Sequence, residues 1–455
     1  MSFPSIVPRL RVASSPGANR RLIRKRNTRL NSKYQDPVTY RKTTLDNGIR
    51  IVTEAVPYMQ SVSLGIWVRC GSRFEDPTHN GICHFIEHMV FKGTERRSAL
   101  DIAKEIDAVG GALNAFTSKE LTCFYCRVLN ENLELAADLL SDIFLNASFP
   151  EHEIEREKQV ICQEIYQVDD SPEDYLHEMF GLRFWHDDPL GQPIMGTIPI
   201  ITGLDRNTII DFKNRYYTPQ ETIVCASGNL DHDYFVDLFQ TEMAKLPNGL
   251  KRDNPNVSKH QPCVHLEKRD IEQVHVCIGT VGPSATHETR HAAYILNTLL
   301  GGGWSSRLFQ EVREKRGLAY SVYSFLSSFL DTGVFGIYAG CEPARLQELI
   351  DVASAETMNL YSSLTDDDIR TAKSHIKGSF ILAMESTDAR MNRLAKCEYY
   401  FDRYLSMAEI IEKMEAATPA ELAETAERML TKGGFTVVGL GPAPDQVDFR
   451  AFGRS

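Results

Sequence analysis

The chain has 455 residues, of which 42% are hydrophobic and 24% are charged, and its formal net charge is −11. This composition is typical of a globular protein, and a chain of this length is expected to form two or more domains. It has no apolar run of about 18 residues or more and no signal-peptide core, so membrane insertion is not expected. No nucleic-acid partner is expected.

The charge is distributed unevenly along the chain. Residues 1–35 contain nine Lys and Arg and no Asp or Glu, so the remainder carries −20. We expect residues 1–38 to form a basic, disordered arm, because they contain few apolar residues in any helical period. The arm resembles a mitochondrial transit peptide, although an unstructured bacterial arm or an upstream start codon would also explain it. The acidic remainder suits a basic peptide substrate, or simply promotes solubility.

A short helical segment, residues 84–88, has the sequence His-Phe-Ile-Glu-His. On a helix His84 and His88 lie about 40° apart around the axis, so both imidazoles can bind one divalent metal such as zinc. Glu87 lies close enough to take a proton from water on that metal. H-x-x-E-H is a zinc-peptidase signature, but two ordinary helix histidines beside a solvated glutamate would give the same pattern. A catalytic zinc site also needs a third protein ligand.

Ten cysteines are spread along the chain. Cys123 and Cys126 form a C-x-x-C motif, but the surrounding sequence is typical of a strand. Residues three apart on a strand face opposite ways, so a redox or metal-binding pair is not expected there. We therefore expect reduced thiols in an intracellular compartment.

Residues 150–166 form an acidic helical pattern that begins at Pro150. Proline suits the first turn of a helix, and carboxylates suit its positive end. Glu157 and Glu164 are seven residues apart, so both face the same way, and Glu164 follows His88 by 76 residues. Because most glutamates on such a helix face solvent, the pattern alone leaves their roles open.

The chain repeats itself after about 210 residues. A strand over 61–68 leads into the helix that carries His84, and a strand over 273–280 leads in the same way into a helix over 291–300. Such self-similarity predicts two copies of one α/β domain. A polar stretch at 247–258 is a natural linker between them.

The second copy lacks the metal-binding side chains. Ala292, Ile295 and Leu296 stand opposite His84, Glu87 and His88, and Ser379 stands opposite Glu164. The second copy therefore cannot hold the metal and must serve another purpose. We place the first, zinc-binding domain at 39–248, the linker at 249–262 and the catalytically silent domain at 263–455.

Five further stretches accompany the zinc motif: Leu45-Asp46-Asn47-Gly48, Gly71-Ser72-Arg73, Phe91-Lys92-Gly93-Thr94, Gly110-Gly111-Ala112-Leu113-Asn114-Ala115 and Ala226-Ser227-Gly228-Asn229-Leu230. From Leu45 to about Gly441 the chain resembles the pitrilysin/insulinase family of zinc endopeptidases. Within that family it resembles the processing-peptidase branch, in particular the bacterial relatives of the mitochondrial processing peptidase β subunit. The resemblance implies an α/β (α+β) fold of two homologous domains, each a mainly antiparallel sheet covered by helices.

The resemblance also assigns roles to the metal-site residues. It implies that His84, His88 and Glu164 bind one Zn²⁺ per chain, and that Glu87 is the general base. Glu157 would orient a ligand from outside the coordination sphere. Zinc and a carboxylate base together would supply the chemistry of peptide hydrolysis.

In this family an Arg and a Tyr seven residues apart in the silent half complete the active site from the facing domain. Arg313 and Tyr320 have that spacing and follow the family-like stretch at 300–307. Their implied roles are to hold the substrate carbonyl and to donate hydrogen bonds to the tetrahedral oxyanion. Without the resemblance, an exposed arginine and a core tyrosine at a helix-to-strand turn would be the simpler interpretation.

Substrate-binding residues follow from the same resemblance: an edge strand (Leu113, Asn114, Ala115), a pocket wall just after the scissile bond (Phe91) and an acidic pair that receives a substrate arginine (Asp174, Glu178). An edge strand can bind an extended peptide through main-chain hydrogen bonds. The alternatives are ordinary core packing for Phe91 and a solvated helix face for the acidic pair.

Two classes of function fit the resemblance, and the intact zinc ligands and base favour the first, an enzyme. The first is a zinc endopeptidase that cleaves short or unfolded, preferably basic peptides, and the second is a structural core subunit of a respiratory bc1-type complex, in which zinc motifs are usually eroded. Within the first class, a bacterial enzyme competes with the mitochondrial processing peptidase β subunit proper. We expect a bacterial cytoplasmic location, or the mitochondrial matrix if residues 1–35 are a transit peptide.

The family's closed peptidase chamber contains four domains, whereas this chain supplies two. We therefore expect a homodimer, because the chain has both the zinc motif and the Arg/Tyr pair. A heterodimer with a homologous non-catalytic subunit is the alternative.

Overall fold

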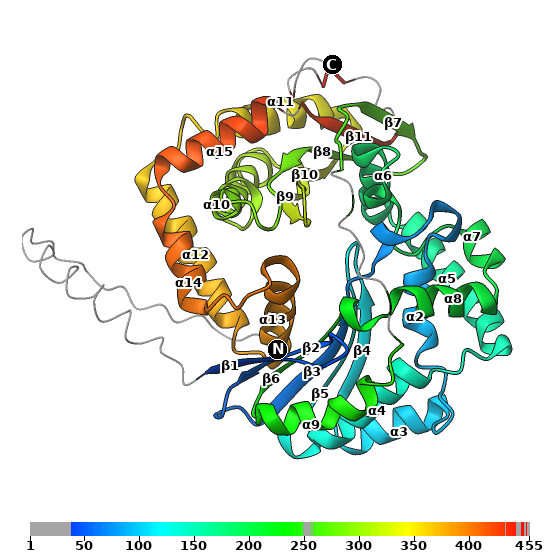
Figure 1. Cartoon of the computed structure of the whole chain (residues 1–455). Coiled ribbons are helices and arrows are strands. Elements are labelled where there is room, and N and C mark those ends of the chain that lie inside the picture. Colours follow the sequence, from blue (N-terminus) through cyan, green and yellow to red (C-terminus); the bar gives the residue numbers. More distant parts are fainter. Residues whose placement is uncertain are drawn as a thin grey trace, which may run out of the picture. The chain divides into compact units, whose positions relative to one another are not determined.

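The computed structural model describes residues 38–247, 249, 255, 258–432, 434–442, 447–449 and 452. The predicted arm at 1–38 lies outside the described residues except for Val38, and so does part of the predicted linker at 249–262. Residues 39–455 pack as one unit that contains two β-sheets and the helices covering them (Figure 1). No helix in the described part of the chain is long and apolar enough to cross a membrane.

The first sheet has six strands in the order β1-β2-β6-β3-β5-β4. These are β1 (Thr39–Thr44), β2 (Arg50–Ala55), β3 (Ser61–Val68), β4 (Ala112–Thr117), β5 (Thr122–Leu129) and β6 (Thr222–Gly228). All neighbours are antiparallel except β2 and β6. Cys123 and Cys126 lie on β5, both buried, and form no disulfide. Strand β4 lies at the edge of the sheet, so one side of its backbone has no strand partner among the described residues.

The second sheet has five strands in the order β7-β11-β8-β10-β9. These are β7 (Val264–Lys268), β8 (Val274–Gly282), β9 (Ala319–Ser328), β10 (Gly333–Cys341) and β11 (Thr436–Gly441). Only β7 and β11 are parallel. The predicted fold class, with two mainly antiparallel sheets covered by helices, is confirmed.

Helices connect and cover the strands. The first half of the unit has α2 (Ile82–Met89), α3 (Ala99–Ala108), α4 (Leu133–Asn146), α5 (Glu151–Asp170), α6 (Pro172–Trp185), α7 (Ile198–Gly203), α8 (Arg206–Tyr216) and α9 (His232–Met243). The second half has α10 (Arg290–Gly301), α11 (Leu346–Met358), α12 (Asp366–Ala383), α13 (Thr387–Phe401), α14 (Met407–Ala416) and α15 (Pro419–Lys432).

One helix from each half packs on the sheet of the other half. Helix α6, from the first half, packs on β8 and β11, and helix α13, from the second half, packs on β2, β3 and β6 (Figure 1). The α6 contact is a buried apolar cluster that includes Leu176, Phe180 and Phe184. The α13 contact combines apolar residues such as Met391 with a buried ion pair between Arg390 and Glu54 at 2.9 Å. The sequence limits predicted for the two domains stay predictions.

A buried arginine also ties the halves together. Arg73, 4% exposed, donates to Glu120 and to Asp331 at 2.7 Å and to Ser258 at 2.9 Å. Asp331 lies between β9 and β10, whereas Glu120 lies in the turn between β4 and β5. Gly71 lies against the same turn, where an added Cβ would come within 2.1 Å of a backbone oxygen. The family-like stretch at 71–73 therefore fixes the turn at 118–121.

Candidate metal centre

Helix α2 is held at its N-terminus by a buried carboxylate. Glu75, 3% exposed, accepts hydrogen bonds from the backbone N–H groups of Gly81 at 2.7 Å and Cys83 at 2.8 Å. Burial raises the pKa of Glu75 to about 6, although these hydrogen bonds oppose the shift. A carboxylate at a helix N-terminus satisfies free N–H groups and complements the helix dipole. Sequence analysis did not single out Glu75.

The two faces of α2 have opposite character. Phe85, Ile86 and Met89 are fully buried in the core of the first half, which anchors the helix against the sheet. The metal-site residues His84, Glu87 and His88 lie on the other face and are each only partly buried. The amphipathic pattern therefore presents the predicted metal-binding groups away from the core.

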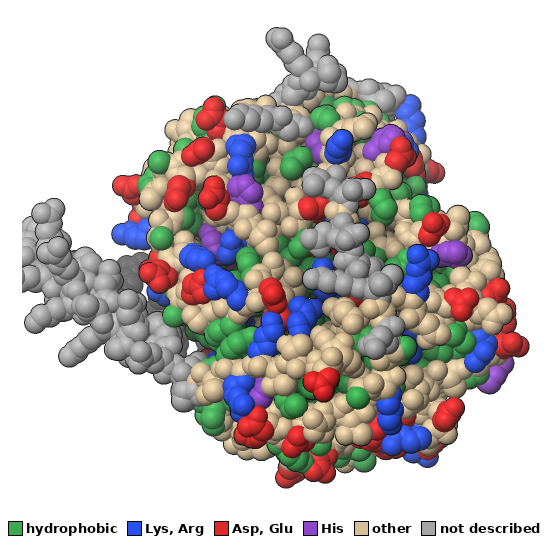
Figure 2. Space-filling model, viewed as in Figure 1, with side chains coloured by type: hydrophobic (Ala, Val, Ile, Leu, Met, Phe, Trp, Pro, Cys, Tyr) green, Lys and Arg blue, Asp and Glu red, His purple; other side chains and the backbone are tan. Residues whose placement is uncertain are grey.

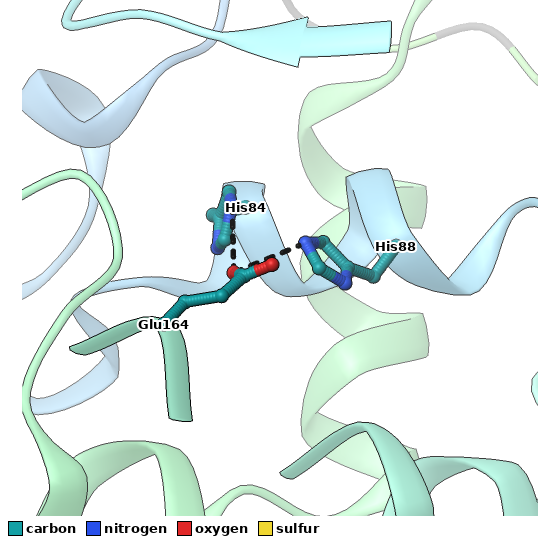
Figure 3. Close-up of side chains that lie close together, drawn as sticks. All are labelled: His84, His88 and Glu164. Carbon is teal, nitrogen blue, oxygen red and sulfur yellow. Dashed lines mark ion pairs between the residues drawn. The ribbon is translucent and has the colours of Figure 1, made fainter. Parts of the chain in front are cut away.

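Glu164 on α5 meets both histidines (Figure 3). Its Oε2 lies 3.8 Å from Nε2 of His84 and 3.6 Å from Nε2 of His88. One ligand atom from each residue lies within 4.8 Å of the others, and the described residues contain this one group of three potential metal ligands. Two nitrogens and a carboxylate oxygen suit zinc and leave a fourth coordination position open.

The protonation chemistry of the donors also fits a metal ion. Burial, with a smaller contribution from His88, lowers the pKa of His84 to about 4, so its imidazole is neutral at neutral pH. His88 places Nδ1 2.9 Å from Oε2 of Glu157, which is itself 2% exposed and paired with Lys92. Because Nδ1–H donates to this carboxylate, Nε2 is left free to bind a metal. Glu157 therefore lies where a carboxylate that orients a ligand should lie.

Glu87 faces a cavity of about 730 Å³ whose lining also includes His84. One of its carboxylate oxygens, Oε2, is buried and has no hydrogen-bond partner among the described residues. Burial raises the pKa of Glu87. A partly dehydrated carboxylate with a free oxygen, next to three metal donors, is suited to accept a proton from water.

The predicted substrate-binding residues are placed in different ways. Leu113, Asn114 and Ala115 lie on the edge strand β4, and Asn114 is exposed. Phe91 packs, partly buried, against the first core and does not line the cavity.

The acidic pair on α6 is also divided. Glu178 lines the cavity, whereas Asp174 is exposed and does not. The structure therefore brings Glu178, but not Asp174, into the space beside the metal centre.

Arg313 and Tyr320 lie together, apart from this cavity. The Arg313 guanidinium stacks 4.3 Å from the centre of the Tyr320 ring and donates to the Tyr320 carbonyl at 3.1 Å. Arg313 is on a π-helical segment, Phe309–Glu314, and Tyr320 is the unpaired residue of a bulge between β9 and β10. Such irregularities often redirect side chains at functional sites. Tyr320 is 77% exposed, and neither residue lines the cavity of its own chain.

Sequence analysis missed several residues of the cavity wall. Lys119 enters from the turn between β4 and β5, His177 from α6 and Tyr323 from β9. His177 Nε2 lies 2.7 Å from the Tyr323 hydroxyl, which donates to Glu173 at 2.7 Å. Tyr323 lies 146 residues from His177, so no local sequence signal could have joined them.

Two families of known sequences match the chain. Residues 50–198 match insulinase (peptidase family M16), and residues 203–376 match the peptidase M16 inactive domain. The first match contains the metal-site residues, and the second contains the Arg313/Tyr320 pair.

Curated relatives extend over most of the chain. An uncharacterized zinc protease of Streptomyces coelicolor is 40% identical over 420 residues, which cover 90% of this chain and 91% of the relative. One of Mycobacterium leprae is 41% identical over 405 residues, covering 88% and 91%. Another, YmxG of Bacillus subtilis, is 36% identical over 397 residues, covering 86% and 96%.

Solved structures share the fold at lower identity. A protease from Helicobacter pylori superposes with a TM-score of 0.82 at 24% identity, covering 89% of this chain and 100% of that chain. A chain of complex III2 from Candida albicans superposes with a TM-score of 0.80 at 20% identity, covering 90% and 98%. At these identities the likeness concerns the fold alone.

Proposed function

Because the chain belongs to the insulinase family (peptidase family M16) and is a zinc metallopeptidase, we propose that it is an endopeptidase for short or unfolded peptides. The observation that carries the proposal is the convergence of His84, His88 and Glu164 beside the free carboxylate oxygen of Glu87. These three residues are the proposed ligands of one zinc ion per chain.

The residues around this centre would divide the work of hydrolysis. A zinc ion held there would polarise the scissile carbonyl and make an attacking water molecule more acidic. Glu87 would take the proton from that water and pass it to the leaving amine. Glu157 would hold His88 in the orientation that its hydrogen bond already fixes. Strand β4 would hold the extended peptide by main-chain hydrogen bonds at its free edge.

The exposed Arg313/Tyr320 pair supports the proposal of a homodimer. Neither side chain lines the cavity of its own chain, so the pair is free to complete the site of a second copy. Two copies would supply the four domains of a closed chamber, which would admit unfolded peptides and exclude folded proteins.

The preference for basic peptides is proposed from charge. The chain outside residues 1–35 carries −20, which would attract basic peptides, less strongly as salt rises. On the face shown in Figure 2, acidic and basic side chains are interspersed, so the attraction would come from net charge. Asp174, exposed on α6, is proposed to meet a basic side chain outside the cavity.

A chelator experiment tests the proposed function. The purified chain should cleave an unstructured peptide, lose this activity with 1,10-phenanthroline, and regain it when zinc is added back. A folded protein of matched composition should resist cleavage. No cleavage of any peptide by the zinc-loaded chain would contradict the proposal.

A mixing experiment tests the dimer. Glu87→Gln and Arg313→Ala should each be inactive alone, because each lacks one part of every site. After subunit exchange, mixed dimers should contain one complete site and restore about a quarter of the wild-type activity. If Arg313 acted within its own chain, or if a different subunit were required, mixing would restore nothing.

A structural subunit is the second candidate, favoured by the fold shared with the complex III2 chain. Zinc content and peptide hydrolysis by the isolated chain would distinguish it from the enzyme. We further propose a location in the bacterial cytoplasm, or in the mitochondrial matrix if residues 1–35 act as a transit peptide; fractionation of cells that express the full chain tests this.

A further inference from the structure

The N-termini of α2 and α10 are satisfied in different ways. At α2 the buried carboxylate of Glu75 accepts hydrogen bonds from two backbone N–H groups. In the aligned repeat Pro283 stands opposite Glu75, so the second half has no carboxylate at this position. Thr289, the residue before α10, supplies no side-chain cap. The N–H groups in the first turn of this 12-residue helix have no partners inside the helix, and they therefore lack the carboxylate that α2 has.

A cavity of about 610 Å³ opens at the start of α10. Its wall consists of the first turn of α10, the end of α14 and one side of α15, and we call it the α10 cavity. Its volume lies within the range of pockets that hold small ligands. It shares no described lining residue with the cavity beside Glu87. The α10 cavity is therefore a separate space that belongs to the second half.

Two buried polar atoms of the lining have no partner. Thr425 on α15 is 2% exposed, and its hydroxyl oxygen makes no hydrogen bond with any described residue. Nε2 of His291, in the first turn of α10, is also buried and unpartnered among these residues. Both side chains line the α10 cavity. Because a buried polar atom without a partner is unfavourable, these two atoms point to an occupant that can form hydrogen bonds with them.

Two arginines are held at the start of α10 without a carboxylate partner. Arg290 donates to the backbone carbonyl of His287 at 3.2 Å, and Arg428 donates to Oγ1 of Thr289 at 3.0 Å. Both arginines line the α10 cavity, and neither forms an ion pair within the described part of the chain. Their charges are therefore available to an anion at this end of the helix.

The charge around His291 is positive. Burial, with smaller contributions from Arg290 and Lys413, lowers the pKa of His291 to about 4. Three glutamates also line the cavity, and all three are exposed (Glu288, Glu421 and Glu424). Solvent screens exposed charges more strongly than buried ones. An anion at the start of α10 would thus meet cations and the positive end of the helix dipole at close range.

We propose that the α10 cavity binds an oxyanion, the phosphate or carboxylate group of a small metabolite, at the start of α10. The anion takes at α10 the place that the Glu75 carboxylate takes at α2. It accepts hydrogen bonds from the backbone N–H groups of the first turn and from the two arginines, Arg290 and Arg428. The Thr425 hydroxyl donates to it as well. The site does not depend on the proposed peptidase function, because it shares no described lining residue with the cavity at the metal centre.

The test measures the binding of two probes, inorganic phosphate and malonate, to the zinc-loaded, full-length chain. Isothermal titration calorimetry gives the Kd, and the thermal unfolding midpoint is recorded at an ionic strength held constant with chloride. At least one probe should bind saturably and raise the midpoint as the site fills. A response to phosphate alone would assign the site to phosphate groups, and a response to malonate alone would assign it to carboxylates. If neither probe binds and the midpoints equal the one in chloride, the inference is wrong.

Charge variants then locate the bound anion. Arg428→Gln should raise the Kd by about tenfold or more, because it removes a charged hydrogen-bond donor. Arg370→Gln, at an exposed arginine of α12 that does not line the α10 cavity, makes the same change in net charge and should leave the Kd unchanged. Equal weakening in both variants would show that net charge attracts the anion. An unchanged Kd in Arg428→Gln would place the anion elsewhere, for example on the zinc ion. Either result would contradict the inference.

A neutral pair of variants tests the unpartnered hydroxyl. Thr425→Val keeps nearly the same shape without the hydroxyl and should raise the Kd by about tenfold, because a hydrogen bond to the anion is lost. Thr425→Ser keeps the hydroxyl and should bind more tightly than Thr425→Val. Binding by Thr425→Val that is as tight as in the wild type would contradict the place of this hydroxyl in the site. The thermal unfolding midpoint of each variant without added phosphate or malonate shows whether it is folded.

Discussion

Helices α2 and α10 follow equivalent strands in the two halves but carry opposite chemistry. In α2 the residues that face away from the core are His84, Glu87 and His88, each partly buried. In α10 the corresponding Ala292, Ile295 and Leu296 are at most 3% exposed and belong to the core of the second half.

Helices α5 and α12, which carry the next pair of corresponding residues, also differ between a metal-site residue and an ordinary one. Glu164 on α5 points to the histidines, whereas Ser379 on α12 is exposed. The same position in the fold can therefore carry either a packed helix surface or a metal centre. In the metal centre, the polar side chains are left uncovered by the core of the first half.

The largest effect is expected from a substitution of Glu87, the proposed base, which tests catalysis apart from packing. Glu87→Gln should lower kcat by about 10²–10⁴-fold, because the amide cannot accept the proton, while zinc content stays at the wild-type level. Peptide hydrolysis and metal analysis check this. Zinc content that falls together with activity would show that Glu87 is needed for metal binding.

The matched change in the second half should act on stability. Leu296→His places an imidazole in a site that is fully buried and apolar, and should destabilise the protein by about 2–5 kcal/mol. The specific activity of the fraction that remains folded should be unchanged. Denaturant unfolding measures the loss; a variant as stable as the wild type would mean that α10 is less tightly packed than its burial indicates.

A smaller effect is expected from the carboxylate behind the ligand. Glu157→Gln should weaken zinc binding by about 10–100-fold. The neutral amide accepts a weaker hydrogen bond from His88 Nδ1–H, and the His88 imidazole becomes a less basic zinc ligand. Competition with a chelator of known affinity measures the change. Unaltered zinc affinity would mean that Glu157 serves only in its ion pair with Lys92.

The smallest effect is a control. Ser379→Glu places a carboxylate at the position that corresponds to Glu164, yet the α10 residues that correspond to the two histidines are Ala292 and Leu296. The substitution is on an exposed site, so stability should change by less than about 0.5 kcal/mol. The number of zinc ions per chain should stay the same by mass spectrometry, and a second bound zinc would break the contrast between the halves.

Part of the metal centre follows from the sequence because the signals within each helix are local, whereas the role of Glu164 as a ligand rests on the family resemblance. The i, i+4 spacing of the histidines and the seven-residue spacing of Glu157 and Glu164 each predict one helix face, and the structure brings these faces together. The absence of ligands from the second half is also visible in the aligned repeat.

The rest depends on contacts between distant segments. The wall of the cavity joins Lys119, α6 and β9, which no short pattern connects. The bulge at Tyr320 is a feature of how β9 pairs with β10, and the sequence analysis identified neither it nor the π-helical segment under Arg313. Glu75 was missed because an acid seven residues before the first residue of the helix resembles an ordinary loop residue until the chain folds back onto the N–H groups at the start of α2.

Because α6 and α13 each cover the sheet of the other half, they affect whether the two halves of the chain can be produced as separate fragments. A fragment ending near residue 248 would keep α6 without the strands it covers and would leave β2, β3 and β6 without α13. Each fragment would thus show solvent a sheet face that the intact chain keeps dry, and such faces promote aggregation. Two such fragments produced separately should be insoluble. The same fragments synthesised together in one cell should assemble, with α6 and α13 each packing on the sheet of the other fragment.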